Sequence, residues 1–415
     1  MRDHRYAAIT LAAAIYACGA RAEEAPPIFS FSGFGTVGVI HSDTDKADYL
    51  VDAFHPDGAG RTRRTSADAD SRVGLQLTAN LSSRFTAVVQ VVSEQRYDGT
   101  YRPAVEWANV KFQATPELSV RAGRVVLPIF MVTDSRKVGY ANAWVRPPVE
   151  VYSLVPVTRN DGVDASYRTA VGEASNTIQA TFGRSDSRFP DSAGLGTGTA
   201  KARKLFALVD TFEQGFFTLR LNYGQARLTI DEYAPLTDAL RMFGPQGAAL
   251  ADKYGVQDKR VDFVGVGATY DPGSWFVTGE WADFDTRSVI GKKNAWYVSG
   301  GHRFGKATPY ATYARMKADN STTEPGLSLA GLPVQLAAVG AQLNGIINAQ
   351  LGAIPQQSTV SVGVRWDFMR NFAAKLQYDR VSLGSSSHGT FGNLRPGFQA
   401  GGRVQLFSAA VDFVF

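Results

Sequence analysis

Apolar and polar residues alternate along most of this chain from Ile28 onwards. In residues 72–81, every odd position from Val73 to Leu81 is apolar, and most positions between them are polar. This period of two is typical of β-strands with one apolar face. We predict sixteen strands, at 29–42, 72–81, 85–95, 104–115, 117–125, 160–168, 174–184, 203–213, 215–228, 260–271, 274–285, 293–304, 307–317, 357–368, 371–382 and 402–415.

The connections between these strands alternate between short and longer ones. Residues 82–84 and 370–371 form tight turns, whereas 43–71, 126–159 and 318–356 are long loops. A β-sandwich or a propeller does not require this alternation, but an up-and-down barrel that crosses a membrane does. Strands of about ten residues also suit such a crossing. The sequence therefore predicts an all-β, transmembrane, antiparallel up-and-down β-barrel of about 16 strands, with both termini beside the short turns.

The composition neither supports nor excludes a transmembrane barrel, because hydropathy detects transmembrane strands poorly. The chain has 415 residues, of which 44% are hydrophobic and 20% charged, as in many soluble proteins. A barrel whose outer face meets lipid and whose inner face meets water reconciles these values with a membrane protein. At about sixteen strands the interior is too wide to be filled by side chains, so an aqueous channel is expected.

Residues 1–22 have the features of a secretory signal peptide. Arg2 and Arg5 precede a short apolar segment, and Ala20-Arg21-Ala22 matches a cleavage site. A membrane anchor, or a lipoprotein signal ending at Cys18, is a weaker alternative. Cleavage would leave a barrel of residues 23–415 without cysteine and would lower the formal net charge from +5 to +3. This charge gives no support for nucleic acid as a partner.

The predicted signal peptide, the first strand "SFSGFGTVGV", the long third outer loop and the terminal "AAVDFVF" resemble the Gram-negative general diffusion porins. The resemblance implies a homotrimer in the cell outer membrane, surrounded by lipid and lipopolysaccharide. It also implies that Phe413 and Phe415 in the last strand form the signal read by the outer-membrane assembly machinery, and that the third loop folds inward to narrow the pore. The third loop lacks the "PEFGG" stretch of many enterobacterial members.

The third loop, 126–159, is the candidate constriction. It is too apolar for a disordered segment, because residues such as Ile129, Phe130 and Trp144 require burial. Packing inside the barrel would bury them; the alternative is an outer loop that makes subunit contacts. The charged candidates in this segment are Asp134, Arg136, Lys137, Arg146, Glu150 and Arg159.

Alternation also identifies charged side chains that should line the barrel wall. The resemblance implies a ladder of wall bases opposite a loop carboxylate, and hence a field across the pore. Because both signs of charge are present, we predict at most a mild preference for anions. Each of these charges could equally be a solvated residue without a selective role. The pore-wall candidates are Arg72, Glu94, Lys111, Arg121, Arg220, Arg365 and Lys375, with Asp164, Asp367, Asp379 and Asp412 as further inward acids.

Two long loops should contain helices, because 318–356 has apolar residues at helical spacing and 229–259 is partly similar. Asp68 and Asp70 lack the rest of a calcium loop, and no histidines stand at zinc-binding spacing. We therefore expect no metal, no cofactor and no enzymatic activity.

The predicted function is passive diffusion of small hydrophilic solutes and ions through a water-filled channel. The alternative is a substrate-selective channel for oligosaccharides, phosphate-like anions or carboxylates. A barrel enzyme is disfavoured because a catalytic constellation is missing. A plugged receptor is disfavoured because no plug domain precedes the first strand.

Overall fold

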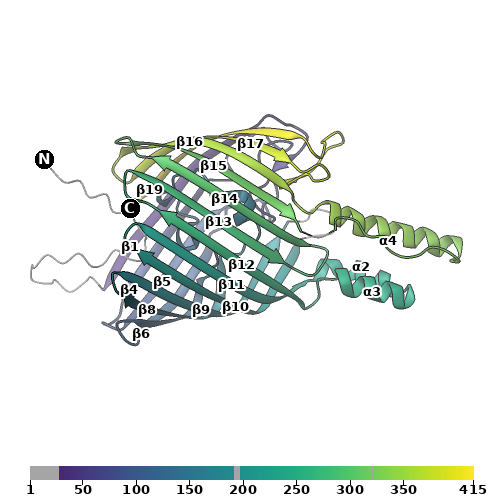
Figure 1. Ribbon diagram of the computed structural model, residues 1–415, viewed down its shortest axis with the longest axis horizontal. Helices are drawn as coiled ribbons and strands as arrows, with labels where there is room; N and C mark the ends of the chain where they lie inside the picture. Colours follow the sequence, from purple (N-terminus) through teal and green to yellow (C-terminus); the bar gives the residue numbers. More distant parts are fainter. Residues whose placement is uncertain (1–27, 191–196, 320) are drawn as a thin grey trace, which may run out of the picture.

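The computed structural model describes residues 28–190, 197–319 and 321–415, so the predicted signal peptide lies outside the described residues. Sixteen long strands form one closed barrel (Figure 1). They are β1 (Phe29–Ser42), β4 (Arg72–Asn80), β5 (Phe85–Glu94), β6 (Ala104–Gln113), β7 (Leu118–Val126), β8 (Arg159–Val171), β9 (Ala174–Phe189), β10 (Gly198–Gln214), β11 (Phe217–Ile230), β12 (Lys259–Tyr270), β13 (Trp275–Asp285), β14 (Lys292–His302), β15 (Ala307–Ala318), β16 (Gln357–Met369), β17 (Phe372–Leu383) and β19 (Arg403–Val414).

Every long strand pairs antiparallel with its neighbours, and β1 pairs with both β4 and β19, which closes the sheet. The predicted barrel of sixteen strands is confirmed. The largest difference in bounds is the β9–β10 hairpin, which extends beyond the prediction at both of its long ends. The far end of this hairpin is polar, and its register shifts between Ala202 and Leu205. The alternation of apolar and polar residues therefore stops there, although the backbone pairing of the two strands continues.

The two faces of the sheet differ as the alternation predicts. Val73, Leu75 and Leu77 are exposed on the outward face of β4. Aromatic side chains gather outside the short turns, where Phe216 contacts Tyr270 and Tyr270 contacts Trp275. Apolar outward faces with aromatic girdles are the signature of barrels that cross a membrane.

The C-terminal strand is held inside the closed sheet. Phe415 and Gly33 exchange two backbone hydrogen bonds of 2.9 and 3.0 Å. The rings of Phe413 and Phe415 lie over Gly35 and Gly33, where an added Cβ would lie 2.3 and 2.4 Å from the nearest ring atoms. The terminal phenylalanine thus packs on β1 because glycine leaves space for its ring.

The opposite rim carries the long loops and all the longer helices (Figure 1). There, α2 (Ala234–Arg241), α3 (Gly244–Tyr254) and α4 (Val334–Gly352) share an apolar cluster that includes Leu240 and Ile347. The helices predicted in 229–259 and 318–356 are confirmed. None of the helices in the described residues is both long and apolar enough to cross a membrane.

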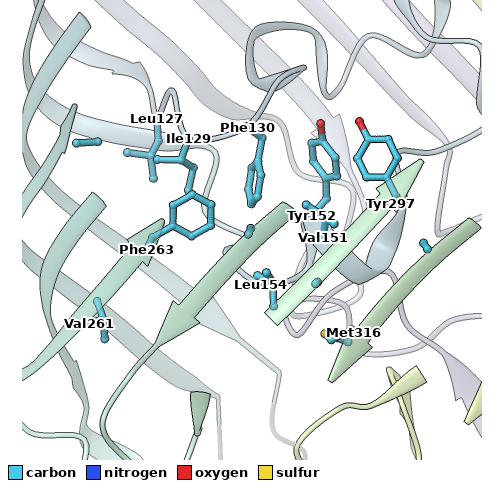
Figure 2. Packing of buried hydrophobic residues seen from close by; sticks show 14 of the residues in the cluster. Leu127, Ile129, Phe130, Val151, Tyr152, Leu154, Val261, Phe263, Tyr297 and Met316 are labelled. Atoms are coloured by element: carbon cyan, nitrogen blue, oxygen red, sulfur yellow. The ribbon is translucent and has the colours of Figure 1, made fainter. Parts of the chain in front are cut away.

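The third loop, residues 127–158, contains η1 (Thr133–Ser135), η2 (Gly139–Ala141) and α1 (Val149–Tyr152). Its apolar residues form, with the inner faces of β10–β15, the largest hydrophobic cluster among the described residues. Figure 2 shows Phe130 beside Phe263 of β12, and Tyr152 beside Tyr297 of β14. From these contacts we infer that the third loop lies inside the barrel, against one half of its wall.

Candidate functional site

A buried ion pair holds the third loop to the wall. The guanidinium of Arg146 donates to both carboxylate oxygens of Asp70, at 2.9 and 2.6 Å, and to Ser408 at 2.8 Å. Asp379 of β17 lies 3.3 Å away. Burial alone would lower the pKa of Arg146, but the Asp70 carboxylate beside it raises that pKa, so the guanidinium stays charged. Arg146 therefore holds the third loop to Asp70.

Three cations from the wall bind backbone carbonyls of the third loop. Arg220 donates to Phe130 O at 2.8 Å, and Arg365 donates to Tyr140 O at 2.5 Å. Lys375 donates to Gly139 O at 2.7 Å and lies 2.8 Å from Asp412. Buried carbonyls require donors, and these side chains supply them.

Their burial corrects part of the sequence interpretation. Arg220 is 9% exposed and Lys375 is 1% exposed, so neither side chain faces open water in the barrel. Arg365 is also held by the third loop. The predicted arrangement of wall bases facing a loop carboxylate is wrong for these three residues, because the loop packs directly onto them.

Two buried carboxylates complete the attachment. Glu150 accepts hydrogen bonds from Gln357, at 2.7 Å, and from Thr359, and burial raises its pKa. Glu280 accepts the backbone N–H of Met131 at 2.9 Å and the hydroxyls of Tyr152 and Tyr297.

The sequence analysis missed Glu280 altogether. Its inward position on β13 follows from the same alternation that identified the other wall charges, so the signal was present.

On the other side of the third loop the barrel contains a cavity of about 490 Å³. In its lining, Lys137 pairs with Glu94 of β5, at 2.5 Å, and with Glu106 of β6, at 3.0 Å. Arg159 lies 3.1 Å from Glu106, and Arg72 lies 3.7 Å from Glu94. Burial would lower the pKa of Lys137, but Glu106 and Glu94 raise it, so the lysine stays charged.

The structure therefore brings four predicted residues, Arg72, Glu94, Lys137 and Arg159, to one cluster with Glu106, which the sequence analysis missed. In this cluster the wall supplies both carboxylates and two of the three cations, and the loop supplies Lys137, whereas a loop carboxylate facing wall bases was expected. Glu106 was hidden because the pairing of β5 and β6 shifts between Gln90 and Val91, which interrupts the alternation.

The remaining predicted residues are dispersed. Arg136 is packed near the rings of Phe130 and Tyr152, and burial lowers its pKa. Asp134 is exposed and has no ion-pair partner among the described residues. Arg121 pairs with Asp164 at 2.8 Å on the wall.

Lys111, the last of the predicted wall bases, follows the same inward alternation. It lies opposite Arg121 on the neighbouring strand β7. No ion pair of Lys111 is present in the part of the chain that the structure describes.

The first loop, residues 43–71, also lines the cavity. His55 Nδ1 lies 2.8 Å from Asp52 Oδ1. Burial would raise the pKa of Asp52, but the neighbouring His55 lowers it to about 2. Burial would lower the pKa of His55, but Asp52 raises it above 6.5.

The end of the cavity at the long-loop rim carries further cations. Arg188 donates to the hydroxyl of Tyr97 at 2.8 Å, and the guanidinium carbons of Arg96 and Arg188 lie 5.9 and 5.7 Å from the Tyr97 ring centre. Arg102 lines the same region. Altogether nine lysines and arginines line the cavity, against four carboxylates. Within the described residues, no three His, Cys, Asp or Glu side chains are grouped so that they could hold a metal ion.

Known proteins agree with this architecture. OmpF of Salmonella typhi, in complex with daunomycin, is 12% identical, with a TM-score of 0.53 over 93% of this chain and 97% of that chain. The trimer form of the outer membrane protein OmpT of Vibrio cholerae is 11% identical, with a TM-score of 0.51 over 93% of this chain and 99% of that chain. At this identity the likeness shows the fold.

No curated protein matches the sequence. The family described as Gram-negative porin, in contrast, matches residues 7–382, which is most of the chain. The chain therefore belongs to the Gram-negative porin family and is a diffusion channel of the outer membrane.

Proposed function

We propose that solutes cross the barrel through the space between the third loop and strands β4–β10, and that this passage favours small anions. The apolar core closes the β10–β15 side, because Phe130, Tyr152 and their neighbours fill it. The single observation that carries the proposal is the lining of the remaining cavity, where nine cations face four carboxylates.

Pairing within the lining divides it into two levels. At the level of Lys137, this lysine bridges Glu94 and Glu106, so the charges there largely balance one another. At the mouth, Arg96 and Arg102 form no ion pair with any described residue. Charges in a cleft with low-dielectric walls concentrate ions of opposite sign, so the mouth should attract anions.

The alternative, a selective oligosaccharide channel, receives less support. A row of aromatic rings along the passage would favour sugars, but Phe130, Phe263 and Tyr297 are buried in the core. The chemistry of the lining fits passive movement of hydrated solutes. We therefore propose a general diffusion channel without enzymatic activity, which needs no cofactor.

We propose that residues 1–22 are removed during export and that Phe413 and Phe415 present the last strand to the outer-membrane assembly machinery. We also propose a homotrimer embedded in lipid and lipopolysaccharide. The trimer form of the Vibrio cholerae protein supports this assembly by analogy of fold.

Conductance in planar bilayers with asymmetric KCl tests the proposed passage. We expect a water-filled channel whose reversal potential shifts toward chloride, and a smaller shift after Arg96→Gln combined with Arg102→Gln. Arg227→Gln combined with Arg260→Gln is the matched control, because both side chains face outward from the barrel. A cation-selective channel, or no channel from folded protein, would contradict the proposal.

A further inference from the structure

One sector of the outward face carries cations without counter-charges. Arg315 and Lys317 of β15, Arg380 of β17 and Arg403 of β19 are exposed at the long-loop ends of their strands. The outward residues of β15, β16, β17 and β19 include no carboxylate. Among the described residues none of these four cations has an ion-pair partner.

Strand register brings three of these arginines together. Arg315 pairs with Ser358, Ser358 with Ser382, and Ser382 with Arg403, so the four residues form one row across the sheet. Arg380 lies in the adjoining row, opposite Gln405. At a strand spacing of about 4.8 Å, the row spans roughly 14 Å.

A carboxylate does lie at the edge of this row. Asp43 accepts the backbone N–H of Gln405 at 3.0 Å and makes no ion pair with the arginines.

The neighbouring sector is built differently. On β11–β14 the outward cations at the same rim are paired: Arg227 with Asp258 at 3.8 Å, Arg260 with Asp262 at 2.8 Å, and Lys292 with Asp283 at 3.6 Å. The barrel exterior therefore does not carry unpaired arginines throughout. Their concentration on β15–β19 forms a positive patch that would attract an external anion.

The height of this arginine row places it at the border of the apolar band. From Phe413 to Arg403, β19 rises roughly 24 Å along the barrel axis, at about 3.4 Å per residue and a tilt of about 45°. The apolar band of such barrels is about 25 Å tall. Aromatic pairs lie below the cations, where the rings of Trp296 and Tyr313 are 5.3 Å apart and those of Tyr378 and Phe407 are 5.0 Å apart.

We propose that Arg315, Arg380 and Arg403 bind the phosphate groups of a lipopolysaccharide headgroup in the outer leaflet. Guanidinium groups bind phosphate oxygens through charge-assisted hydrogen bonds, and Ser358 and Ser382 add hydroxyl donors between them. The aromatic rings below would contact the acyl chains of the same lipid. Free phosphate has the same headgroup chemistry but would gain nothing from the aromatic rings, so the membrane lipid is the favoured source.

Native mass spectrometry of the folded, detergent-purified protein with added lipid A tests this site. We expect bisphosphorylated lipid A to bind the parent protein more tightly than dephosphorylated lipid A. The combined change Arg315→Gln, Arg380→Gln and Arg403→Gln should weaken binding about tenfold or more, since three charge-assisted contacts are lost. The corresponding triple change to Lys should retain most of the binding.

The matched control neutralises three outward cations of the paired sector, Arg227→Gln, Arg260→Gln and Lys292→Gln, and should leave lipid A binding unchanged. Heat-modifiable mobility on gels verifies that each variant is folded. Equal binding by the two glutamine triples, or equal binding of the dephosphorylated lipid to the parent protein, would overturn the proposal. So would displacement of lipid A by equimolar inorganic phosphate, which would identify a free-phosphate site.

Discussion

Arg146 of the third loop and Asp70 at the end of the first loop form a two-point ion pair that is almost completely buried. The pair joins two connections that are far apart in the sequence, and Asp379 and Ser408 extend it to the barrel wall. The third loop is thus held from the side of the first loop as well as by the apolar core.

Replacing Arg146 by Met should loosen the third loop. Removal of one partner from a buried pair typically costs about 3–5 kcal/mol, because the remaining carboxylates are left uncompensated. We expect noisier single-channel currents. We also expect proteolytic cleavage of the third loop to begin at a lower temperature. Arg63→Gln is the control, because that arginine pairs with Asp68 at an exposed position. Identical current noise in both variants would show that the pair does not fix the loop.

Lys137 should control the ion preference of the passage where it bridges Glu94 and Glu106. In Lys137→Met, Glu94 and Glu106 lose the cation between them, and the passage gains net negative charge. The reversal potential in asymmetric KCl should move toward the potassium side. Lys306→Met, at the short-turn rim, serves as the control. An unchanged reversal potential for Lys137→Met would place the ion path elsewhere in the barrel.

The sequence predicts the barrel closely because the period of two is a local signal, repeated in every strand. The attachment of the third loop is not local. Lys375 and Gly139, or Arg220 and Phe130, are far apart in the chain, and nothing near either residue identifies the other. The alternation therefore placed these cations on the inner face correctly, but it could not reveal that the loop covers them.

The Asp52–His55 pair predicts a pH dependence of ion preference. Because the folded pKa of His55 is raised, its ionic contribution to stability is complete below 6.5 and is lost as the pH rises through the raised value. Asp52 contributes above 3.8, and its contribution is lost as the pH falls through about 2. The other charges facing His55 are Glu94 and Arg72.

Deprotonation of His55 removes a positive charge from the cavity lining. Raising the pH above 6.5 should therefore reduce the preference for chloride, and this step should be absent in His55→Gln. His41→Gln provides the control, since His41 is exposed on the outward face of β1. Reversal potentials measured over a pH series distinguish the two variants. A step of equal size in His55→Gln would assign it to another group.

The terminal phenylalanine should matter for assembly more than for conduction. Deleting Phe415 removes the ring over Gly33, and Gly33→Ala should displace the same ring, because the new Cβ would lie 2.4 Å from its Cζ. Both changes should lower the folded yield in the outer membrane, measured by heat-modifiable mobility. Gly300→Ala is the control, since its Cβ would meet only ordinary contacts from 3.4 Å. Equal yields would contradict an assembly role.

The helices beyond the long-loop rim should be dispensable for the channel. The apolar cluster of α2, α3 and α4, with Leu343, Ile347 and Leu351 among its buried residues, shares no buried residue with the core of the third loop and borders it through partly buried Leu228. Its loss should therefore leave the strands and the cavity lining intact. Replacing residues 331–355 by a short Gly-Ser connection should preserve single-channel conductance. It should expose Leu240 and Leu250 on the remaining helices, so solubility in mild detergent should fall. Reduced conductance in the shortened protein would show instead that these helices support the passage.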